Sequence, residues 1–428
     1  FSFVSGQPSH SRPRNIQQLW GPYSPFFSEP EPSEISAAIP PGCEITFAQV
    51  LSRHGARDPI RVMAEKFAEL VHRIHTSVTR YGRGYEFIKT YKYTLGTEQL
   101  TPLGERELIE SGKAFHKRYQ ALAAMNKPFI RAAGQERVIE SGHNWIQGFY
   151  GSITDGHKRD MLIIPEAHGV NNTLKHGLCT AFEHDIHSNL GKAARVKWRN
   201  IFTRPIIDRL NHNLPGARLT AADVLTFMEL CPFNTVVNGK MSQFCNLFTL
   251  EEFLDFEYYQ TLDKYYRFHE GNPLGPTQGV GFTNELIARL TQKPVVDHTS
   301  TNSTLTSNPA TFPLNRKLYA DFTHDNDMYS IYGALGLYSK TPKLSTTQRM
   351  SVSETRGFSS RLVPFAARMY VEKMRCNSLE EEMVRVLVND RVVPLLGCHA
   401  DNLGRCRLSP FVESLGFARR GGLWDRCF

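Results

Sequence analysis

The sequence predicts an α/β protein whose sheet domain, flanked by helices, is interrupted by a smaller helical domain. Short apolar segments that predict strands, such as 44–52 and 318–323, are each followed by apolar residues at helical spacing. Between about 175 and 292 the pattern becomes mainly helical, and strands alternate with helices on either side of it. We therefore expect an extended arm over 1–40, an α/β domain formed by 41–165 and 293–428, and a helical insertion over 166–292.

The first elements follow from composition and spacing. The arm is rich in Pro, Ser and Gln, and its segment 20–27 is aromatic enough that we expect it to dock on the protein. The strand 44–52 precedes a helix with apolar residues Met63, Phe67, Leu70, Val71 and Ile74. Thr101 and Pro102 are typical of an N-cap and a first helical position, and they open a helix through about Leu122.

The remaining elements follow the same rules. Strands are predicted at 128–132, 161–165 and 318–323, and a hairpin is predicted from 384–388 and 392–395. Helices are predicted at 138–149, 192–212, 220–230, 250–268 and 282–292, and a helix after 318–323 carries Met328, Ile331 and Leu335 on one face.

The cysteines and sequons favour an oxidising, extracellular compartment. The eight cysteines form no C-x-x-C pair, so disulfides are a better interpretation than a metal site, for which Cys398, His399 and Cys406 are the nearest candidates. Asn171 and Asn302 each begin an Asn-x-Thr sequon. The sequence begins without a signal-peptide pattern, so the protein is either cytosolic or given without a leader that was removed.

The charge indicates an anionic partner. The formal net charge is +8, and no stretch approaches the roughly 18 apolar residues of a membrane helix. The chain has no run of five or six basic residues and no aromatic and basic pattern of an RNA-binding signature. A small polyanionic substrate fits this charge as well as nucleic acid does. For the chain as a whole we expect the small substrate, and neither nucleic acid nor a membrane, as the partner.

Residues 53–59, directly after the first strand, carry the strongest functional signal. They read Arg-His-Gly-Ala-Arg-Asp-Pro, and loops at the carboxyl ends of sheet strands are where ligands bind in open α/β folds. Arg53 and Arg57 offer forked donors suited to phosphate, and their charges favour a neutral, nucleophilic His54. This pattern predicts a phosphate site built around a histidine nucleophile. The alternative is an arginine-rich surface turn with an incidental histidine.

His324 and Asp325 form a second candidate pair at the end of another predicted strand. Transfer of phosphate from an alkyl ester needs a proton donor for the leaving alkoxide, and Asp325 is a candidate, with His324 donating to the phosphate. A His-Asp pair before a helix is also a common helix cap.

The two motifs together resemble the histidine acid phosphatases. Arg-His-Gly-x-Arg-x-Pro followed far downstream by His-Asp is similar to that family, and 47–52, 271–281 and 384–394 resemble secreted fungal phytases. The similarity runs from about residue 19 to the C-terminus. It implies a phosphoglycerate-mutase-like fold and a monomeric, secreted enzyme that acts on myo-inositol hexakisphosphate without a metal or cofactor.

The resemblance also implies residue roles. His54 is then the nucleophile that forms a phosphohistidine, Asp325 is the proton donor, and the phosphate is held by Arg53, Arg57, Arg137 and His324. The implied disulfides are Cys43–Cys376, Cys179–Cys427, Cys231–Cys245 and Cys398–Cys406.

The sequence departs from the phytase pattern around the expected substrate pocket. Asp58 replaces a common tyrosine and either repels substrate near neutral pH or caps the following helix. Met63 and Asp263 stand where lysines are expected. The remaining candidate substrate contacts are Tyr23, Lys66, Lys264 and Asn326. These departures leave open a broad-specificity acid phosphatase, and the basic charge leaves open a polyanion binder without catalysis.

Overall fold

One mixed sheet brings the segments that follow the predicted strands to a common edge. The computed structural model describes residues 15–28, 35–151, 160–377 and 379–428, and in these residues eight strands form the sheet. Their order is β3-β2-β4-β1-β5-β6-β7, with β8 paired to β6. Their bounds are β1 Cys43–Arg53, β2 Phe129–Ala133, β3 Leu162–Ile164, β4 Leu318–Thr323, β5 Arg368–Cys376, β6 Met383–Val388, β7 Arg391–Val392 and β8 Cys406–Arg407.

The central strands β1 and β4 are buried on both faces. Every residue of β1 from Ile45 onward is buried, and so are all six residues of β4. Parallel strands covered on both sides consist of nearly continuous apolar runs, which explains why both segments stand out in the sequence. β4 pairs in parallel with β1 and β2, whereas β5 runs antiparallel to β1.

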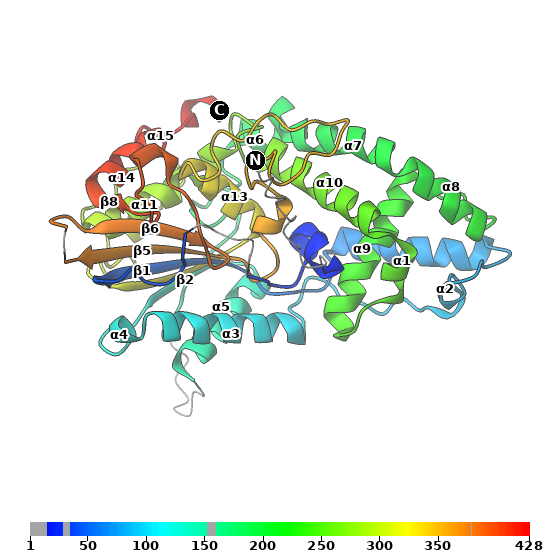
Figure 1. Ribbon diagram of the computed structural model, residues 1–428, viewed down its shortest axis with the longest axis horizontal. Helices are drawn as coiled ribbons and strands as arrows, with labels where there is room; N and C mark the ends of the chain where they lie inside the picture. Colours follow the sequence, from blue (N-terminus) through cyan, green and yellow to red (C-terminus); the bar gives the residue numbers. More distant parts are fainter. Residues whose placement is uncertain (1–14, 29–34, 152–159, 378) are drawn as a thin grey trace, which may run out of the picture.

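Helices α3 (Pro102–Arg118) and α5 (Glu136–Tyr150) pack against each other below the sheet in Figure 1. Two glycines permit this close contact. A Cβ on Gly112 would collide with the carbonyl of Trp145, and one on Gly148 with the carbonyl of Ile109. The opposite side of the sheet carries α11 (Val280–Thr291), α13 (Asp325–Ala334), α14 (Leu408–Ser414) and α15 (Gly416–Arg419).

A group of helices extends to the right of the sheet in Figure 1. It contains α1 Arg61–Ser77, α2 Phe87–Thr90, α7 Leu190–Phe202, α8 Arg204–Asn213, α9 Ala221–Asn238 and α10 Leu250–Phe268. The shorter helices are α4 Gln120–Ala123, α6 Thr180–His184 and α12 Ser303–Thr306. Because α1 packs against α9, the helical group includes a segment that precedes residue 166. The division at 166–292 into an inserted domain stays a prediction.

Four predicted elements differ from the structure. The helix expected at 220–230 continues to Asn238 as α9, with Pro232 inside it. The helix expected at 192–212 is two helices that meet at Thr203, and Pro205 lies in the first turn of the second one. The helix expected through Leu122 ends at Arg118. The second strand of the predicted hairpin is only the two-residue β7. Strand β5 was not predicted at all.

Residues 15–28 of the predicted arm dock on the protein. Trp20 is fully buried, and the backbone N–H of Phe365 donates to the carbonyl of Ser24 at 2.9 Å. The Arg368 guanidinium lies 3.8 Å from the centre of the Phe26 ring. This docking brings Tyr23 toward the motif loop. The parts of the arm at 1–14 and 29–34 lie outside the described residues.

Four disulfides cross-link the structure. Their pairs are those that the resemblance implies: Cys43–Cys376, Cys179–Cys427, Cys231–Cys245 and Cys398–Cys406. Cys398 and Cys406 therefore bond to each other, which overturns their alternative interpretation as metal ligands.

Candidate active site

The two motifs meet because their strands are neighbours. Arg53 at the end of β1 pairs with Thr323 at the end of β4, so His54 and His324 follow at the same level of the sheet. The backbone N–H of His54 donates to the carbonyl of Thr323 at 3.2 Å, and the two imidazole rings lie 5.7 Å apart. Arg137 belongs to the first turn of α5, just after the next parallel strand, β2. Ligands of open α/β sheets bind at such strand ends.

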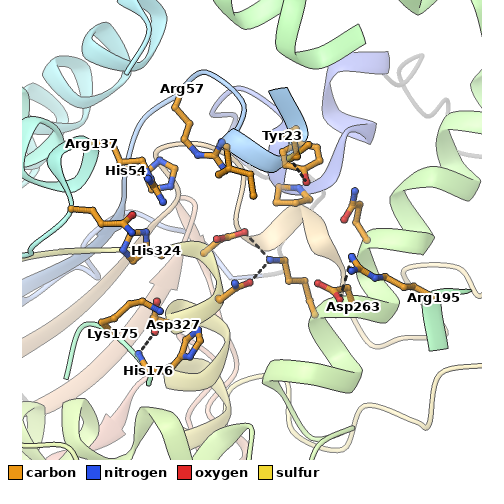
Figure 2. Close-up of a pocket in the computed structure, with 18 residues that line it drawn as sticks. Tyr23, His54, Arg57, Arg137, Lys175, His176, Arg195, Asp263, His324 and Asp327 are labelled. Atoms are coloured by element: carbon orange, nitrogen blue, oxygen red, sulfur yellow. Dashed lines mark hydrogen bonds and ion pairs between the residues drawn. The ribbon is translucent and has the colours of Figure 1, made fainter. Parts of the chain in front are cut away.

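A cavity of about 290 Å³ opens over these strand ends. Figure 2 shows His54, His324 and Arg137 on one side of it and Arg195 and Asp263 on the other. The predicted site residues that line it are Tyr23, His54, Arg57, Arg137, Lys264, His324, Asp325 and Asn326.

Two predicted site residues do not line the cavity. Arg53 lies behind its wall, with 1% of its surface exposed. Lys66 lies on the exposed side of α1, so the structure does not bring this predicted substrate contact to the site.

The loop that carries His54 is held by close packing. A Cβ on Gly55 would collide with the carbonyl of Gly104, so the glycine is required for contact with the start of α3. The backbone N–H of Gly55 donates to the Ser141 hydroxyl of α5 at 3.1 Å. The N–H of Ala56 donates to the Glu107 carboxylate at 2.8 Å. Both helices below the sheet therefore fix the position of the nucleophile candidate.

The surroundings of His54 favour a neutral ring, and among the described residues one of its two ring nitrogens has no hydrogen-bond partner. Its Nδ1 lies 2.9 Å from the carbonyl of Gly55, which can only accept, so Nδ1 carries the proton and Nε2 keeps its lone pair. Burial, followed by the positive charges of Arg53, Arg137 and Arg57, holds the pKa of His54 well below its ordinary value. An imidazole in this state is suited to nucleophilic attack.

Three arginines surround this imidazole with few anionic partners. Arg53 donates to the carbonyls of Pro22 and Val363. Burial, together with Arg137 and Arg53, lowers the pKa of Arg57 to about 9. The only described carboxylate in ion-pair distance of Arg137 is Glu98, at 3.7 Å. Concentrated positive charge with unfilled donors favours binding of a phosphate.

Asp325 forms ion pairs beside the nucleophile candidate. Its Oδ2 lies 2.7 Å from the Lys264 ammonium and 3.6 Å from the Arg53 guanidinium. Burial raises the pKa of Asp325, but the charges of Arg53 and Lys264 outweigh burial and hold the pKa well below its ordinary value. The carboxyl group is therefore ionised when the cavity holds no anion.

Glu166 is a functional candidate that sequence reasoning missed. Its Oε1 lies 2.9 Å from Nε2 of His324 and also accepts from the backbone N–H of Gln135 at 3.0 Å. Burial raises the pKa of Glu166, but the hydrogen bond and charge of His324, the hydrogen bond from Gln135 and the charge of Lys175 together outweigh burial, and the pKa is lowered. Glu166 follows β3, so its position at a fourth strand end was the signal available in the sequence.

The three departures from the phytase pattern have separate environments. Asp58 accepts from the backbone N–H of Gly96 at 3.0 Å, and Ile60 is the N-cap of α1, so Asp58 does not cap that helix. Met63 lines the cavity with its sulfur 3.9 Å from the Tyr23 hydroxyl. Asp263 also lines the cavity and pairs with Arg195 at 3.4 Å.

The cavity has further polar residues that the motifs did not reveal: Gln135, Lys175, His176, Arg195, Gln260 and Asp327. Among the described residues, no group of three or more His, Cys, Asp or Glu side chains is arranged to hold a metal ion.

The two sequon asparagines lie in different settings. The Asn171 amide donates to the carbonyls of Thr301 at 2.8 Å and Thr299 at 3.4 Å. Asn302 caps α12 through its side-chain oxygen, which accepts from Leu305 N at 3.3 Å.

Residues 44–389 match the Histidine phosphatase superfamily (branch 2), and the chain belongs to this family. Its members are phosphomonoester hydrolases, so the family agrees with the phosphate chemistry of the site. The chain is 50% identical to Phytase A of Aspergillus oryzae over 426 residues, which cover 96% of this chain and 91% of that protein. It is also 50% identical to Phytase A of Aspergillus fumigatus over 422 residues, with 96% and 90% covered. The predicted resemblance is thereby confirmed.

Solved structures support the fold. A phytase from D. castellii superposes with a TM-score of 0.79 at 22% identity, covering 94% of this chain and 85% of that chain. The Bifidobacterium longum multiple inositol polyphosphate phosphatase in complex with inositol hexasulfate gives 0.63 at 14% identity, covering 93% and 97%. In the part of the chain that the structure describes, no helix combines the length and apolar character needed to cross a membrane.

Proposed function

We propose that the protein is a phytase that removes phosphate from myo-inositol hexakisphosphate through a phosphohistidine intermediate. The observation that carries this proposal is the neutral His54 imidazole among Arg53, Arg57 and Arg137, with Asp325 lining the same cavity. The relatives named Phytase A support the choice of substrate.

In the first step, Nε2 of His54 attacks phosphorus as the bond from phosphorus to the ester oxygen breaks. The guanidiniums of Arg57 and Arg137 stabilise the charge on the transferring phosphoryl oxygens. His324 does so as an imidazolium, with Nε2 donating to Glu166 and Nδ1 donating to the phosphate. Arg53 contributes its charge from behind the cavity wall. The products of this step are phosphohistidine and an alkoxide that needs a proton.

Asp325 supplies that proton. In the free protein Arg53 and Lys264 keep its carboxyl group ionised. A bound phosphate brings negative charge beside Asp325, and this charge opposes the effect of the two cations and favours the protonated acid. In the second step the Asp325 carboxylate accepts a proton from water, the water oxygen bonds to phosphorus, and the bond from phosphorus to Nε2 breaks.

A broad-specificity acid phosphatase is the second candidate. Met63 and Asp263 in the cavity wall remove positive charge from positions where the phytase pattern has lysines, which weakens the case for tight binding of a hexakisphosphate. A preference for p-nitrophenyl phosphate over phytate would select this candidate.

The test is phosphate release from phytate between about pH 3 and 7, with excess chelator, by the wild type and by His54→Ala and Asp325→Asn. We expect no turnover by His54→Ala. We expect Asp325→Asn to lose about 10²- to 10⁴-fold on phytate but less on p-nitrophenyl phosphate, whose leaving group needs no proton. Unchanged turnover by His54→Ala would exclude the mechanism. Equal losses on both esters in the formation of phosphohistidine, measured in a single turnover before the hydrolysis step that both esters share, would exclude Asp325 as the donor.

The proposal also includes an extracellular location, a monomeric state, and glycans on Asn171 and Asn302. Four disulfides support an oxidising compartment. Mass spectrometry of the secreted protein, before and after removal of N-glycans, tests the two sequons.

A further inference from the structure

We infer that Lys175 is a specificity residue that binds a phosphate group of the substrate other than the one being cleaved. This inference rests on the proposed function, since it concerns substrates with several phosphates. It names a cation that neither motif contains.

The backbone around Lys175 is tied to both ends of the segment that carries His324 and Asp325. The Thr323 hydroxyl donates to the carbonyl of Leu174 at 2.5 Å. The backbone N–H of His176 donates to the Asp327 carboxylate at 2.6 Å. Lys175 therefore lies between two anchored neighbours, and its backbone is fixed relative to the reacting groups.

The preceding turn is fixed as well. The Asn172 amide donates to the carbonyl of Ile164 at 3.1 Å, and its side-chain oxygen accepts from the N–H of Leu174 at 2.8 Å. Asn172 itself is buried. The loop that carries Lys175 is thus a fixed part of the cavity wall.

The Lys175 side chain is half-buried and lines the cavity, yet within the described residues its ammonium has no hydrogen bond and no ion pair. The other lysine and arginine side chains of the cavity have partners. These contacts are Lys264 with Asp325, Arg195 with Asp263, Arg137 with Glu98, and Arg57 with the carbonyl of Asp58.

The two carboxylates that feel the charge of Lys175 already have hydrogen-bond partners. Glu166 and Glu183 are both affected by the charge of Lys175. However, Glu166 accepts a hydrogen bond from His324 at 2.9 Å, and Glu183 contacts the His176 ring at 2.5 Å. The positive charge of Lys175 is therefore available to an incoming anion.

The location suits a second phosphate. In Figure 2 Lys175 lies below His324, on the other side of the cavity from Arg195. An inositol ring with one phosphate at His54 presents its neighbouring phosphates to the cavity wall. A lysine there forms a charge-assisted hydrogen bond with the polyphosphate but has no group to bind on a monoester such as p-nitrophenyl phosphate.

The experiment measures competitive inhibition of p-nitrophenyl phosphate hydrolysis by myo-inositol hexakissulfate and by inorganic phosphate. We expect Lys175→Gln to raise the inhibition constant of the hexakissulfate about 10-fold, with the constant for inorganic phosphate and the kcat/KM for p-nitrophenyl phosphate unchanged within about twofold. Lys175→Arg should restore hexakissulfate binding. Lys117→Gln, which removes an exposed lysine of α3, is the control for net charge and should match the wild type.

Two results would overturn the inference. One is an unchanged hexakissulfate constant in Lys175→Gln, and the other is an equal loss for hexakissulfate and inorganic phosphate. Because this assay uses a monoester as the substrate, it remains decisive even if phytate is not hydrolysed, which would be a failure of the proposed function alone.

Discussion

The Lys264 ammonium lies 2.7 Å from the carboxylate of Asp325, and this contact connects the helical group to the end of strand β4. Lys264 is nearly fully buried in α10, whereas Asp325 is the first residue of α13. A helix outside the sheet thus contributes, together with Arg53 of β1, to the low pKa of the proposed proton donor.

Removing this cation should move the pH profile. The proposed acid must be protonated, so kcat falls as the pH rises through its pKa. Lys264 lowers the pKa of Asp325, so Lys264→Gln should raise that pKa and shift the fall of kcat upward by about one pH unit. The measurement is kcat against pH at saturating substrate. Lys264→Arg should keep the wild-type profile, and an unshifted fall in Lys264→Gln would mean that Asp325 is not the titrating acid.

Glu166 should act through His324. Glu166→Gln removes the charge that orients the imidazole, and we expect kcat/KM to fall about 10-fold. His324→Gln should lose more, and the double variant should lose no more than His324→Gln alone. Additive losses in this double-mutant cycle would show that Glu166 acts independently of His324.

The buried ion pairs beneath the site should dominate stability. Asp321 lies 2.8 Å from Arg131 and 2.6 Å from Arg289, and all three side chains are buried. Asp321→Asn leaves the buried Arg289 without its ion-pair partner, while Arg131 keeps its contact with Glu285 at 2.8 Å. The substitution should cost about 3–5 kcal/mol in the free energy of unfolding, measured in urea. Asp208→Asn, at an exposed position of α8, should cost less than about 0.5 kcal/mol. Equal costs would contradict this assignment.

Asp321 should also contribute to acid sensitivity. The charges of Arg131 and Arg289 outweigh burial and hold the pKa of Asp321 below its ordinary value. Its contribution to stability is therefore present above the pKa of the unfolded chain and is lost as the pH falls through the lower, folded value.

Glu107 should give the opposite dependence of stability on pH. It accepts hydrogen bonds from Phe26 and Ala56, and burial raises its pKa from 4.5 to about 7. The folded state then binds the Glu107 proton more tightly than the unfolded chain does. The stabilisation from this proton is complete below pH 4.5, and the free energy of unfolding decreases by about 3 kcal/mol as the pH rises to 7. In Glu107→Gln, urea unfolding should show a smaller decrease over that interval. An identical pH dependence in both proteins would exclude a raised pKa for Glu107.

The sequence predicted the centre of the sheet better than its antiparallel half. Strands β1 and β4 are mainly apolar, whereas four of the nine residues of β5 are charged: Arg368, Glu372, Lys373 and Arg375. Glu372 is fully buried because Arg118 and Arg385 pair with it from distant segments. Polar residues that are buried only through such partners hide a strand from any periodicity argument.

The candidate site also contains residues that the sequence predicted and residues that it did not. His54, Arg57, His324 and Asp325 carry a local pattern at strand ends, so the sequence revealed them. Lys66 was expected in the pocket, but the buried face of α1 is formed by Phe67 and its neighbours, and Lys66 points away from it. Lys175 and Arg195 reach the cavity only through the packing of separate segments, for which no sequence spacing provides a signal.

The sheet register also determines how much of the chain must be synthesised before the protein can be active. Ala48 of β1 pairs with Leu318 of β4, and the opposite edge of β1 is completed by β5. The first motif is therefore translated long before its partner strands leave the ribosome. Contacts this distant in sequence form slowly. An unfinished chain has His54 but no assembled phosphate site, so phosphatase activity should arise only after nearly the whole polypeptide has been synthesised.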